Sequence, residues 1–395
     1  MAPFISTDAG LSKSIDNNDR QEYYSSGLRA RFLIDANKAS QKVINQEPEP
    51  TADIGYYVNE EAFKRRSQKS LARRDLLTTV PHGWPLKLEG TGLQSNQVSR
   101  NTFPLPNLGK KLTDICYDIY DGRGFAILRG LDPDVYDIED LTAVYLGVSS
   151  YIGERRGKQD QRGSMLMHVI CRNDEDRDVR YTEDKPFHTD TVTDCLCLFT
   201  QSLAADGGRS VITSAWTVYN ELASTRPDLI HVLAEGNWPF DTFGRNPSYY
   251  KRPLFFYHKE KLIASFSRRL LVGHEPYDKR TPGIPGLTEK QAEALDAVHF
   301  IGRKHEIKPL MEKGDLRFIN NMGVLHRREA FQDSVARARH LVRIWLNNEM
   351  MCWKLPRELR VAWARVFEDD ERESHWDIVP PREGGKVLRV AGTCD

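Results

Sequence analysis

The sequence carries no excess of charge of either sign, and this limits the partners that it can attract. Its 395 residues include 56 Lys plus Arg and 56 Asp plus Glu, so the formal net charge at pH 7 is zero. A neutral chain has no overall field that would draw it to nucleic acid or to an anionic membrane surface. We therefore expect neither among its partners.

Long apolar runs are also absent. No stretch approaches the roughly 20 apolar residues that a membrane-spanning helix requires. The first residues, Met1-Ala-Pro-Phe-Ile-Ser-Thr-Asp8, lack the charged start and the apolar stretch of a secretory signal. Both absences favour a cytoplasmic location.

Cysteine is scarce, and no two cysteines have the Cys-x-x-Cys spacing. Isolated cysteines in a large cytosolic chain are usually small buried hydrophobic residues, so we expect neither a disulfide framework nor a zinc–thiolate site. Two of them, 195 and 197, would lie on one face of a strand. The six are Cys116, Cys171, Cys195, Cys197, Cys352 and Cys394.

The length of the chain and the changes in composition along it suggest three parts. Residues 1–80 have the composition of a polar arm with helices over 26–45 and 59–77, residues 81–370 form one elaborated domain, and residues 371–395 form a tail. A Lys/Arg run in the second helix of the arm would suit nucleic acid, but a solvated helix face fits the zero net charge better. A chain of this length can bury a large core in a single β unit with added helices.

Short apolar segments alternate with charged loops over residues 165–346, as in the strands of a sandwich. Many short strands with inserted helices predict a mainly β fold, a double-stranded β-helix (jelly-roll) core with helical buttresses and an N-terminal arm. The expected strands are 122–131, 164–171, 194–202, 210–214, 254–257, 262–266, 315–320 and 340–346, and the expected helices are 108–121, 137–152, 216–224, 228–234 and 288–303.

The motif Pro186-Phe-His-Thr-Asp190 is the sharpest local feature. On a strand, residues two apart project to the same face, so His188 and Asp190 would present an imidazole and a carboxylate side by side. These are two of the three ligands of the facial triad that non-haem iron(II) oxygenases use. Because His-x-Asp is common by chance, the motif alone is also compatible with a surface pair near a turn.

A third ligand must come from elsewhere, and His326 is the natural candidate. A predicted strand over 315–320 leads into the turn Asn320-Asn-Met-Gly323, after which two apolar residues lead to His326. Two histidines and one carboxylate on one octahedral face leave three positions open. Two donor atoms of an oxoacid and one dioxygen molecule would fill them.

Two arginines follow on the next predicted strand. Arg339 and Arg343 are four residues apart, an even spacing that predicts a shared face. Guanidinium groups hold carboxylates through two parallel hydrogen bonds, which would fix the pose of an acidic cosubstrate. A surface ion pair is the alternative for either arginine taken singly.

Taken together, these residues resemble the taurine dioxygenase/clavaminate synthase-like (TauD/TfdA) family of 2-oxoglutarate-dependent oxygenases. The family's His-x-Asp matches His188 and Asp190, its distal histidine matches His326, and its two C-terminal arginines match Arg339 and Arg343. The resemblance covers roughly residues 103–367 and is specific as a set.

The resemblance implies an enzyme that binds Fe(II) through His188, Asp190 and His326 and uses 2-oxoglutarate and O2 as cosubstrates. Arg339 would grip the distal carboxylate of 2-oxoglutarate, and Arg343 would lie near its other end or near an anionic group of the substrate. The stretch 207–214 matches a Gly-Gly-x-Thr…Thr-Ser pattern of the family, with Ser210 in place of the cosubstrate-binding threonine. Thr213 stays open as the alternative hydroxyl donor.

The implied reaction is oxidation of a small organic substrate, with hydroxylation as the default and desaturation or ring closure as alternatives. Arg343 makes a carboxylate- or sulfonate-bearing molecule, such as an amino acid derivative or a secondary metabolite, a reasonable substrate. A catalytically retired jelly-roll that binds a small acid without turnover, and a metal-dependent hydrolase, are the competing functions. The residues indicate neither the substrate nor the oligomeric state.

Three further residues near the motifs carry expectations of their own. His168 lies in an apolar strand and is expected to line the core or a pocket rather than bind metal. His340 lies between the two arginines and should point away from them. Trp345, two residues beyond Arg343, is expected either to share its inward face or to be ordinary core.

Overall fold

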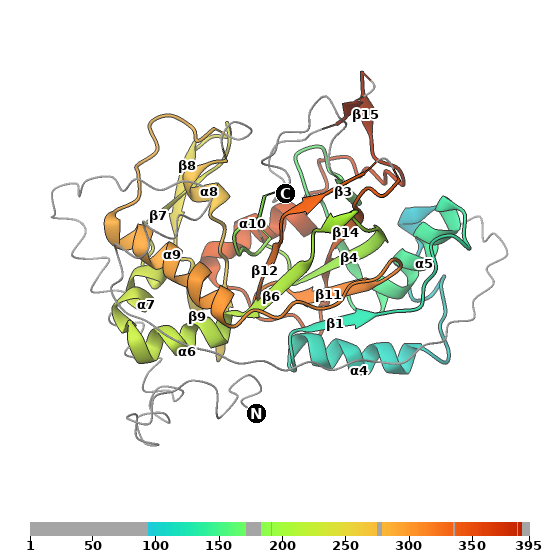
Figure 1. Ribbon diagram of the computed structural model, residues 1–395, viewed down its shortest axis with the longest axis horizontal. Helices are drawn as coiled ribbons and strands as arrows, with labels where there is room; N and C mark the ends of the chain where they lie inside the picture. Colours follow the sequence, from blue (N-terminus) through green and yellow to red (C-terminus); the bar gives the residue numbers. More distant parts are fainter. Residues whose placement is uncertain are drawn as a thin grey trace. The chain divides into compact units, whose positions relative to one another are not determined.

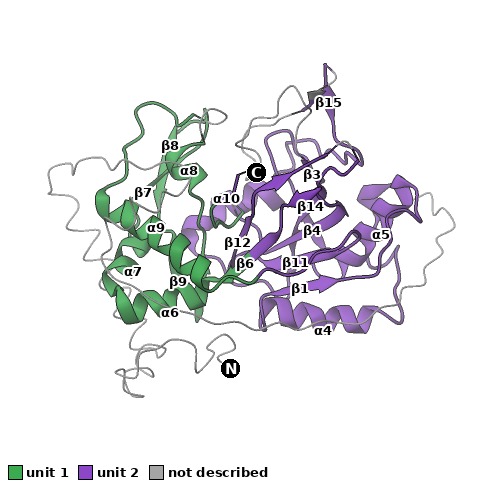
Figure 2. Cartoon of the chain, in the orientation of Figure 1, with its two compact units in different colours: residues 1–75, 186–191, 212–307 green, residues 76–185, 192–211, 308–395 purple. Residues whose placement is uncertain are grey.

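The computed structural model describes residues 94–170, 183–190, 192–274, 279–334, 336–384 and 386–388. The predicted arm over 1–80 with its helices, and the two cysteines Cys171 and Cys394, lie outside these residues. The chain forms two compact units (Figure 2): unit 1 comprises 1–75, 186–191 and 212–307, and unit 2 comprises 76–185, 192–211 and 308–395. These bounds differ from the domain bounds 1–80, 81–370 and 371–395, which stay a prediction.

A six-stranded antiparallel sheet forms the centre of unit 2 (Figure 1). The strand order is β1-β11-β4-β14-β2, and β3 pairs with the other end of β14. The strands are β1 (Phe125–Leu128), β2 (Arg155–Gly157), β3 (Met167–Ile170), β4 (Cys195–Ser202), β11 (Leu316–Asn320) and β14 (His340–Asn347).

One face of this sheet is covered by α4 (Gly109–Tyr120) and α5 (Ile138–Ser150) (Figure 1). Residues 112, 116 and 119 of α4 recur at helical spacing and are all buried, which explains why this stretch forms an amphipathic helix. The side chain of Asp137 caps α5 by accepting a hydrogen bond from the backbone N–H of Asp140 at 2.8 Å. Both predicted cysteines of β4, Cys195 and Cys197, belong to the core on this face.

Smaller elements complete unit 2. β12 pairs with β6, β13 with β5, and β15 with β16, each as a two-stranded sheet. These strands are β5 (Asp206–Gly207), β6 (Ser210–Ser214), β12 (Val324–Arg328), β13 (Phe331–Gln332), β15 (Arg382–Glu383) and β16 (Lys386–Val387). Two more helices, η2 (Ser95–Gln97) and α10 (Arg357–Phe367), belong to the same unit. The first two residues of β6 belong to unit 2 and the other three to unit 1.

Unit 1 consists of helices and two β-hairpins. Its elements are α6 (Ala215–Thr225), α7 (Pro227–Ala234), β7 (Trp238–Asp241), β8 (Tyr249–Arg252), β9 (Phe255–His258), β10 (Lys261–Ala264), α8 (Arg269–Val272) and α9 (Glu289–Lys304). Thr288 and Gln291 form the capping box that their spacing indicates, because each side chain accepts a hydrogen bond from the other residue's backbone N–H. No described helix is long and apolar enough to cross a membrane.

The predicted elements agree with the structure in kind and differ mainly at their ends. The strand predicted over 164–171 is shorter, Met167–Ile170, and the helix predicted over 137–152 is Ile138–Ser150. The short strands β2 and β7 were not predicted. β2 reads Arg-Arg-Gly and has no apolar residue, and β7 contains a proline, which argues against a strand.

Tyr145 of α5 ties the helix to the centre of the sheet. Its hydroxyl group lies 3.1 Å from the carbonyl oxygen of Cys197 on β4 and 3.0 Å from that of Val342 on β14. The side chain is 2% exposed, so water cannot replace the hydrogen bond that the hydroxyl donates.

We predict that Tyr145→Phe destabilises the protein by about 1–2 kcal/mol, because a buried hydrogen bond to the sheet is lost. The midpoint of thermal unfolding should fall by a few degrees. Tyr117→Phe is the matched control, since Tyr117 lies on α4 and is 59% exposed. Equal midpoints for the two variants would contradict the role given to Tyr145.

Candidate metal centre and cosubstrate site

The segment that carries His188 and Asp190 is extended, but it is not the continuous strand that the motif predicted. Only His188 takes part in a β-bridge. The backbone N–H of Thr189 donates to the carbonyl oxygen of Phe266 at 2.7 Å, and the N–H of Phe266 donates to Oγ1 of Thr189 at 2.9 Å. Thr189 is thus held against Phe266, and the side chains on either side of it project the other way, as alternation requires.

His326 lies on β12, directly after a tight turn. Within that turn, Oδ1 of Asn320 accepts a hydrogen bond from the backbone N–H of Met322 at 3.1 Å. The neighbouring Asn321 donates through its side chain to the carbonyl oxygen of Thr193 at 3.1 Å. A methyl group on Gly323 would lie 2.8 Å from the ring of Trp353, so the close packing of the turn requires glycine there. These contacts fix where β12 begins.

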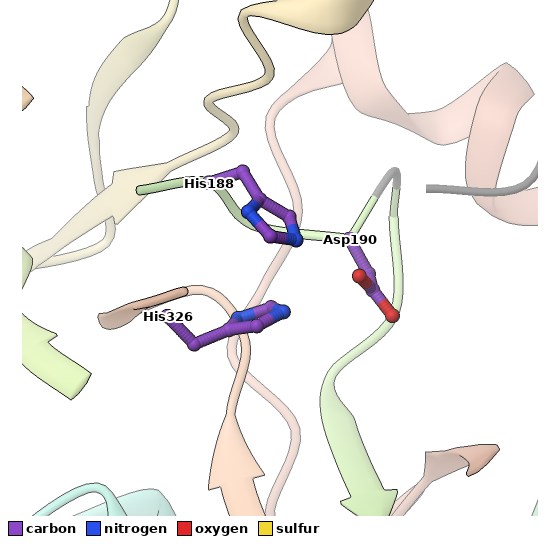
Figure 3. A group of neighbouring side chains, drawn as sticks. All are labelled: His188, Asp190 and His326. Carbon is purple, nitrogen blue, oxygen red and sulfur yellow. The ribbon is translucent and has the colours of Figure 1, made fainter. Parts of the chain in front are cut away.

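The structure brings together the three predicted ligands (Figure 3). His188, Asp190 and His326 each offer one ligand atom, and these atoms all lie within 4.8 Å of one another. Asp190 is fully buried, His326 is 7% exposed, and His188 is partly exposed. It is the only such group of three or more metal-binding side chains found among the residues that the structure describes.

The protonation of His188 suits a metal ligand. Its Nδ1 lies 2.9 Å from the carbonyl oxygen of Pro186, and a carbonyl group can only accept a hydrogen bond. In the neutral ring Nδ1 therefore carries the proton and Nε2 carries the lone pair that a metal would use. Two imidazole nitrogens and one carboxylate oxygen are the donor set of the facial triad, so the residues present fit iron(II).

Arg339 passes over a double-glycine turn. Gly207 and Gly208 have φ angles of +68° and +67°, in the region that favours glycine. A methyl group on Gly208 would lie 3.0 Å from Cβ of Phe331 and 3.1 Å from Cδ of Arg339. The guanidinium carbon of Arg339 lies 5.6 Å from the ring centroid of Phe331, and the side chain is 7% exposed. The glycine pair therefore makes room for the stem of a buried arginine.

Arg339 itself lies just before β14, where its backbone N–H donates to Oδ1 of Asp333 at 2.9 Å. The β4–β14 register shifts between His340 and Leu341. The strand alternation that predicted a shared face for Arg339 and Arg343 consequently does not extend to Arg339. Both arginines are nevertheless buried.

The two candidate hydroxyl donors differ in their surroundings. Ser210 lies two residues beyond Gly208 at the start of β6 and is 6% exposed. Thr213 lies on the same strand, but its Oγ1 donates to the carbonyl oxygen of His305 at 3.4 Å. The position next to the Arg339 turn favours Ser210 as the donor to a carboxylate held there.

Arg343 is held from two sides. Its Nε donates to Oε1 of Gln159 at 2.8 Å, and its guanidinium carbon lies 5.2 Å from the ring centroid of Trp345. Gln159 also donates through Nε2 to the backbone carbonyl groups of Met165 and Arg343. Arg343 is 2% exposed, and Trp345 shares its face of β14, one of the two arrangements expected from the sequence.

His168 and His340 form a pair away from the metal cluster. Nδ1 of His168 lies 2.8 Å from Nε2 of His340, and Nε2 of His168 lies 2.8 Å from the carbonyl oxygen of Asp377. Burial, together with the neighbouring His168, lowers the pKa of His340 to about 3. The pair is thus neutral at physiological pH, in keeping with the structural roles expected for both residues.

Two residues of the site were missed in the sequence. Gln159 lies in a charged stretch with no recognisable pattern, and its partner Arg343 is 184 residues away. Phe331, which contacts Arg339, belongs to a two-residue strand. The only sequence signal for either is that Phe331 is an isolated aromatic residue between the histidine and the arginines.

Known proteins resemble this chain in sequence. The family model described as "Taurine catabolism dioxygenase TauD, TfdA family" matches residues 89–345. The taurine hydroxylase-like protein SAT17 of Stachybotrys chartarum is 34% identical over 298 residues, which cover 72% of this chain and 77% of that protein. The FR-33289 synthase of Streptomyces rubellomurinus is 26% identical over 280 residues, covering 67% and 80%.

Solved structures resemble it in fold. The crystal structure of asparagine oxygenase (AsnO) superimposes with a TM-score of 0.50 at 15% identity, over 64% of this chain and 82% of that chain. The likeness confirms the predicted jelly-roll class with added helices.

Gly208→Ala should weaken 2-oxoglutarate binding roughly 5- to 30-fold, about 1–2 kcal/mol, because the added methyl group displaces the stem of Arg339. Gly283→Ala is the matched control: its φ is +84°, but no atom lies within 4 Å of the added methyl group. Calorimetric titration of 2-oxoglutarate with Mn(II) as an unreactive metal measures both. Equal affinities in the two variants would contradict the placement of the cosubstrate beside Arg339.

Proposed function

Since this chain belongs to the TauD/TfdA family of taurine catabolism dioxygenases, we propose that it hydroxylates a small organic substrate that carries an anionic group. The protein is an Fe(II)- and 2-oxoglutarate-dependent dioxygenase. The reaction type and the substrate are the proposal; desaturation and ring closure are its alternatives. The observation that carries it is the convergence of His188, Asp190 and His326 to within 4.8 Å.

In this proposal Nε2 of His188, a carboxylate oxygen of Asp190 and one ring nitrogen of His326 hold the iron. The hydrogen bond from Nδ1 of His188 to Pro186 orients the first ring, and the contact of Thr189 with Phe266 orients the carboxylate beside it. Rigid support of this kind would keep the three donors in the positions that iron(II) requires.

Arg339 and Ser210 would hold the distal carboxylate of 2-oxoglutarate. When bound, iron(II) supplies the coupled oxidation in which 2-oxoglutarate and O2 become succinate and CO2 and the substrate gains one oxygen atom. The chain's own contribution is to bind and orient. Burial of the Arg339 guanidinium strengthens its attraction for a carboxylate, because little water remains to screen the charge.

Arg343 would bind the substrate, or the near end of the cosubstrate, from a fixed position. Gln159 and Trp345 fix its guanidinium, so little side-chain entropy is lost when an anion binds. A carboxylate or sulfonate on an amino acid derivative or a secondary metabolite fits such a cation. The name of the 34% identical relative, taurine hydroxylase-like, is compatible with a sulfonate.

The first test is the visible absorption of the protein mixed anaerobically with iron(II) and 2-oxoglutarate. Chelation of the metal by the keto acid should give a weak charge-transfer band that bleaches when air is admitted. The band should be lost in His188→Ala, because a ligand is removed. In Arg339→Ala the 2-oxoglutarate concentration needed for half the band should rise roughly 30-fold or more, since truncating one partner of a buried charge pair costs about 2–5 kcal/mol.

His375→Ala is the control for loss of a histidine, since that side chain is 30% exposed and lies outside the metal cluster. A folded wild-type protein without the band would overturn the proposal. It would favour instead a jelly-roll that binds a small acid without turnover.

A further inference from the structure

A further buried arginine, Arg317, lies in the central sheet of unit 2 and has no role so far. It is the second residue of β11 and is 3% exposed. Its Nε and Nη1 are shielded from solvent and have no hydrogen-bond partner among the described residues. Burial lowers its pKa to about 10, which still leaves the group positively charged at neutral pH.

The face of the sheet from which Arg317 projects follows from strand alternation. The core against α4 and α5 takes Leu316 and Phe318 from β11, the two neighbours of Arg317 in sequence. Arg317 therefore projects from the opposite face. The same reasoning applies to Arg343, because the core against the helices takes Val342 and Ile344 from β14.

The two arginines also lie in one row across the sheet. Arg317 is directly opposite Leu198 of β4, and Leu198 is directly opposite Arg343 of β14. Directly paired residues of antiparallel strands share a face. Two strand spacings separate the arginine backbones, about 10 Å, so both side chains can reach a group placed above Leu198.

An arrangement of this kind is unfavourable without an anion. Two like charges on one buried face repel each other, and an arginine shielded from water with hydrogen-bond donors unsatisfied carries a desolvation penalty. Arg156 in the same sheet also leaves its Nε without a partner, but its Nη2 donates to the carbonyl oxygen of Leu146 at 3.0 Å and its guanidinium covers Trp376. Arg317 differs, which points to a ligand as its partner.

We propose that Arg317, together with Arg343, forms the subsite that binds the oxyanion group of the substrate and so determines the preference for anionic substrates. The subsite would take a carboxylate, sulfonate or phosphonate, whose oxygen atoms accept the N–H groups of both guanidinium ions. Leu198 between them has no polar side-chain atom that would compete for these N–H groups. The proposal deepens the proposed function and rests on it for the identity of Arg343 as a substrate-binding residue.

The test compares Arg317→Met with the wild type in the metal-free protein, using inorganic sulfate and methylphosphonate as probes. Each probe should raise the midpoint of thermal unfolding of the wild type, and Arg317→Met should abolish most of that rise. Arg317→Lys should keep part of it, since the charge remains. Without any anion, Arg317→Met should unfold at a higher temperature than the wild type, because an uncompensated buried charge is removed.

Arg156→Met is the control, since it removes a half-buried arginine of the same sheet that has protein partners. It should unfold at a lower temperature and keep the response to sulfate. The proposal is wrong if Arg317→Met, like Arg156→Met, unfolds at a lower temperature than the wild type and keeps the full response to sulfate. Arg317 would then stabilise the fold and not bind an anion.

The anion that binds Arg317 could also be a carboxylate of 2-oxoglutarate. A second titration distinguishes the cosubstrate from the substrate. Binding of 2-oxoglutarate in the presence of Mn(II) should be the same in Arg317→Met and the wild type. A tenfold or larger loss there, with the sulfate response kept, would assign Arg317 to the cosubstrate and overturn the proposal. The anaerobic charge-transfer band reports on the iron site independently, so its absence would contradict the proposed function and leave the sulfate experiment interpretable.

Discussion

The convergence of two histidines and one aspartate is the constraint on which the rest of the site depends. His188 and His326 are 138 residues apart in sequence, yet the three ligand atoms lie within 4.8 Å of one another. A metal tolerates little error in the position of its ligands, so each donor needs a rigid anchor. The hydrogen bonds of Thr189 with Phe266 anchor His188 and Asp190, and the tight turn before β12 anchors His326. Both anchors use backbone groups, which hold a side chain more firmly than another flexible side chain would.

The two faces of the central sheet of unit 2 bury different kinds of side chain. One face packs apolar side chains against α4 and α5, and this core holds the sheet in shape. The opposite face also buries apolar side chains, such as those of Leu196, Ile319 and Trp345, and among them it buries guanidinium groups, whose charge must be compensated. Arg343 is partly compensated by Gln159 and Trp345, and Arg317 has unsatisfied donors among the described residues. Apolar burial thus supports both faces, and in our proposal the guanidinium groups of the second face bind anions.

Much of the fold and the three candidate metal ligands could be predicted because their signals are local. Apolar alternation located the long strands β4 and β14, and a two-residue spacing located His188 and Asp190. What could not be predicted depends on tertiary pairing. The register shift near His340 removes the alternation argument for Arg339, and the contact of Gln159 with Arg343 spans 184 residues. Arg317 did leave a signal, a single charge inside an apolar strand, but only the register shows that it lies in one row with Arg343.

The most direct test of the account is a crystal structure of the protein with Mn(II) and 2-oxoglutarate, using anomalous scattering to locate the metal. The account predicts one anomalous peak bound by His188, Asp190 and His326, with the distal carboxylate of 2-oxoglutarate against Arg339 and Ser210. A peak bound by other residues, or a cosubstrate carboxylate that lies away from Arg339, would contradict it.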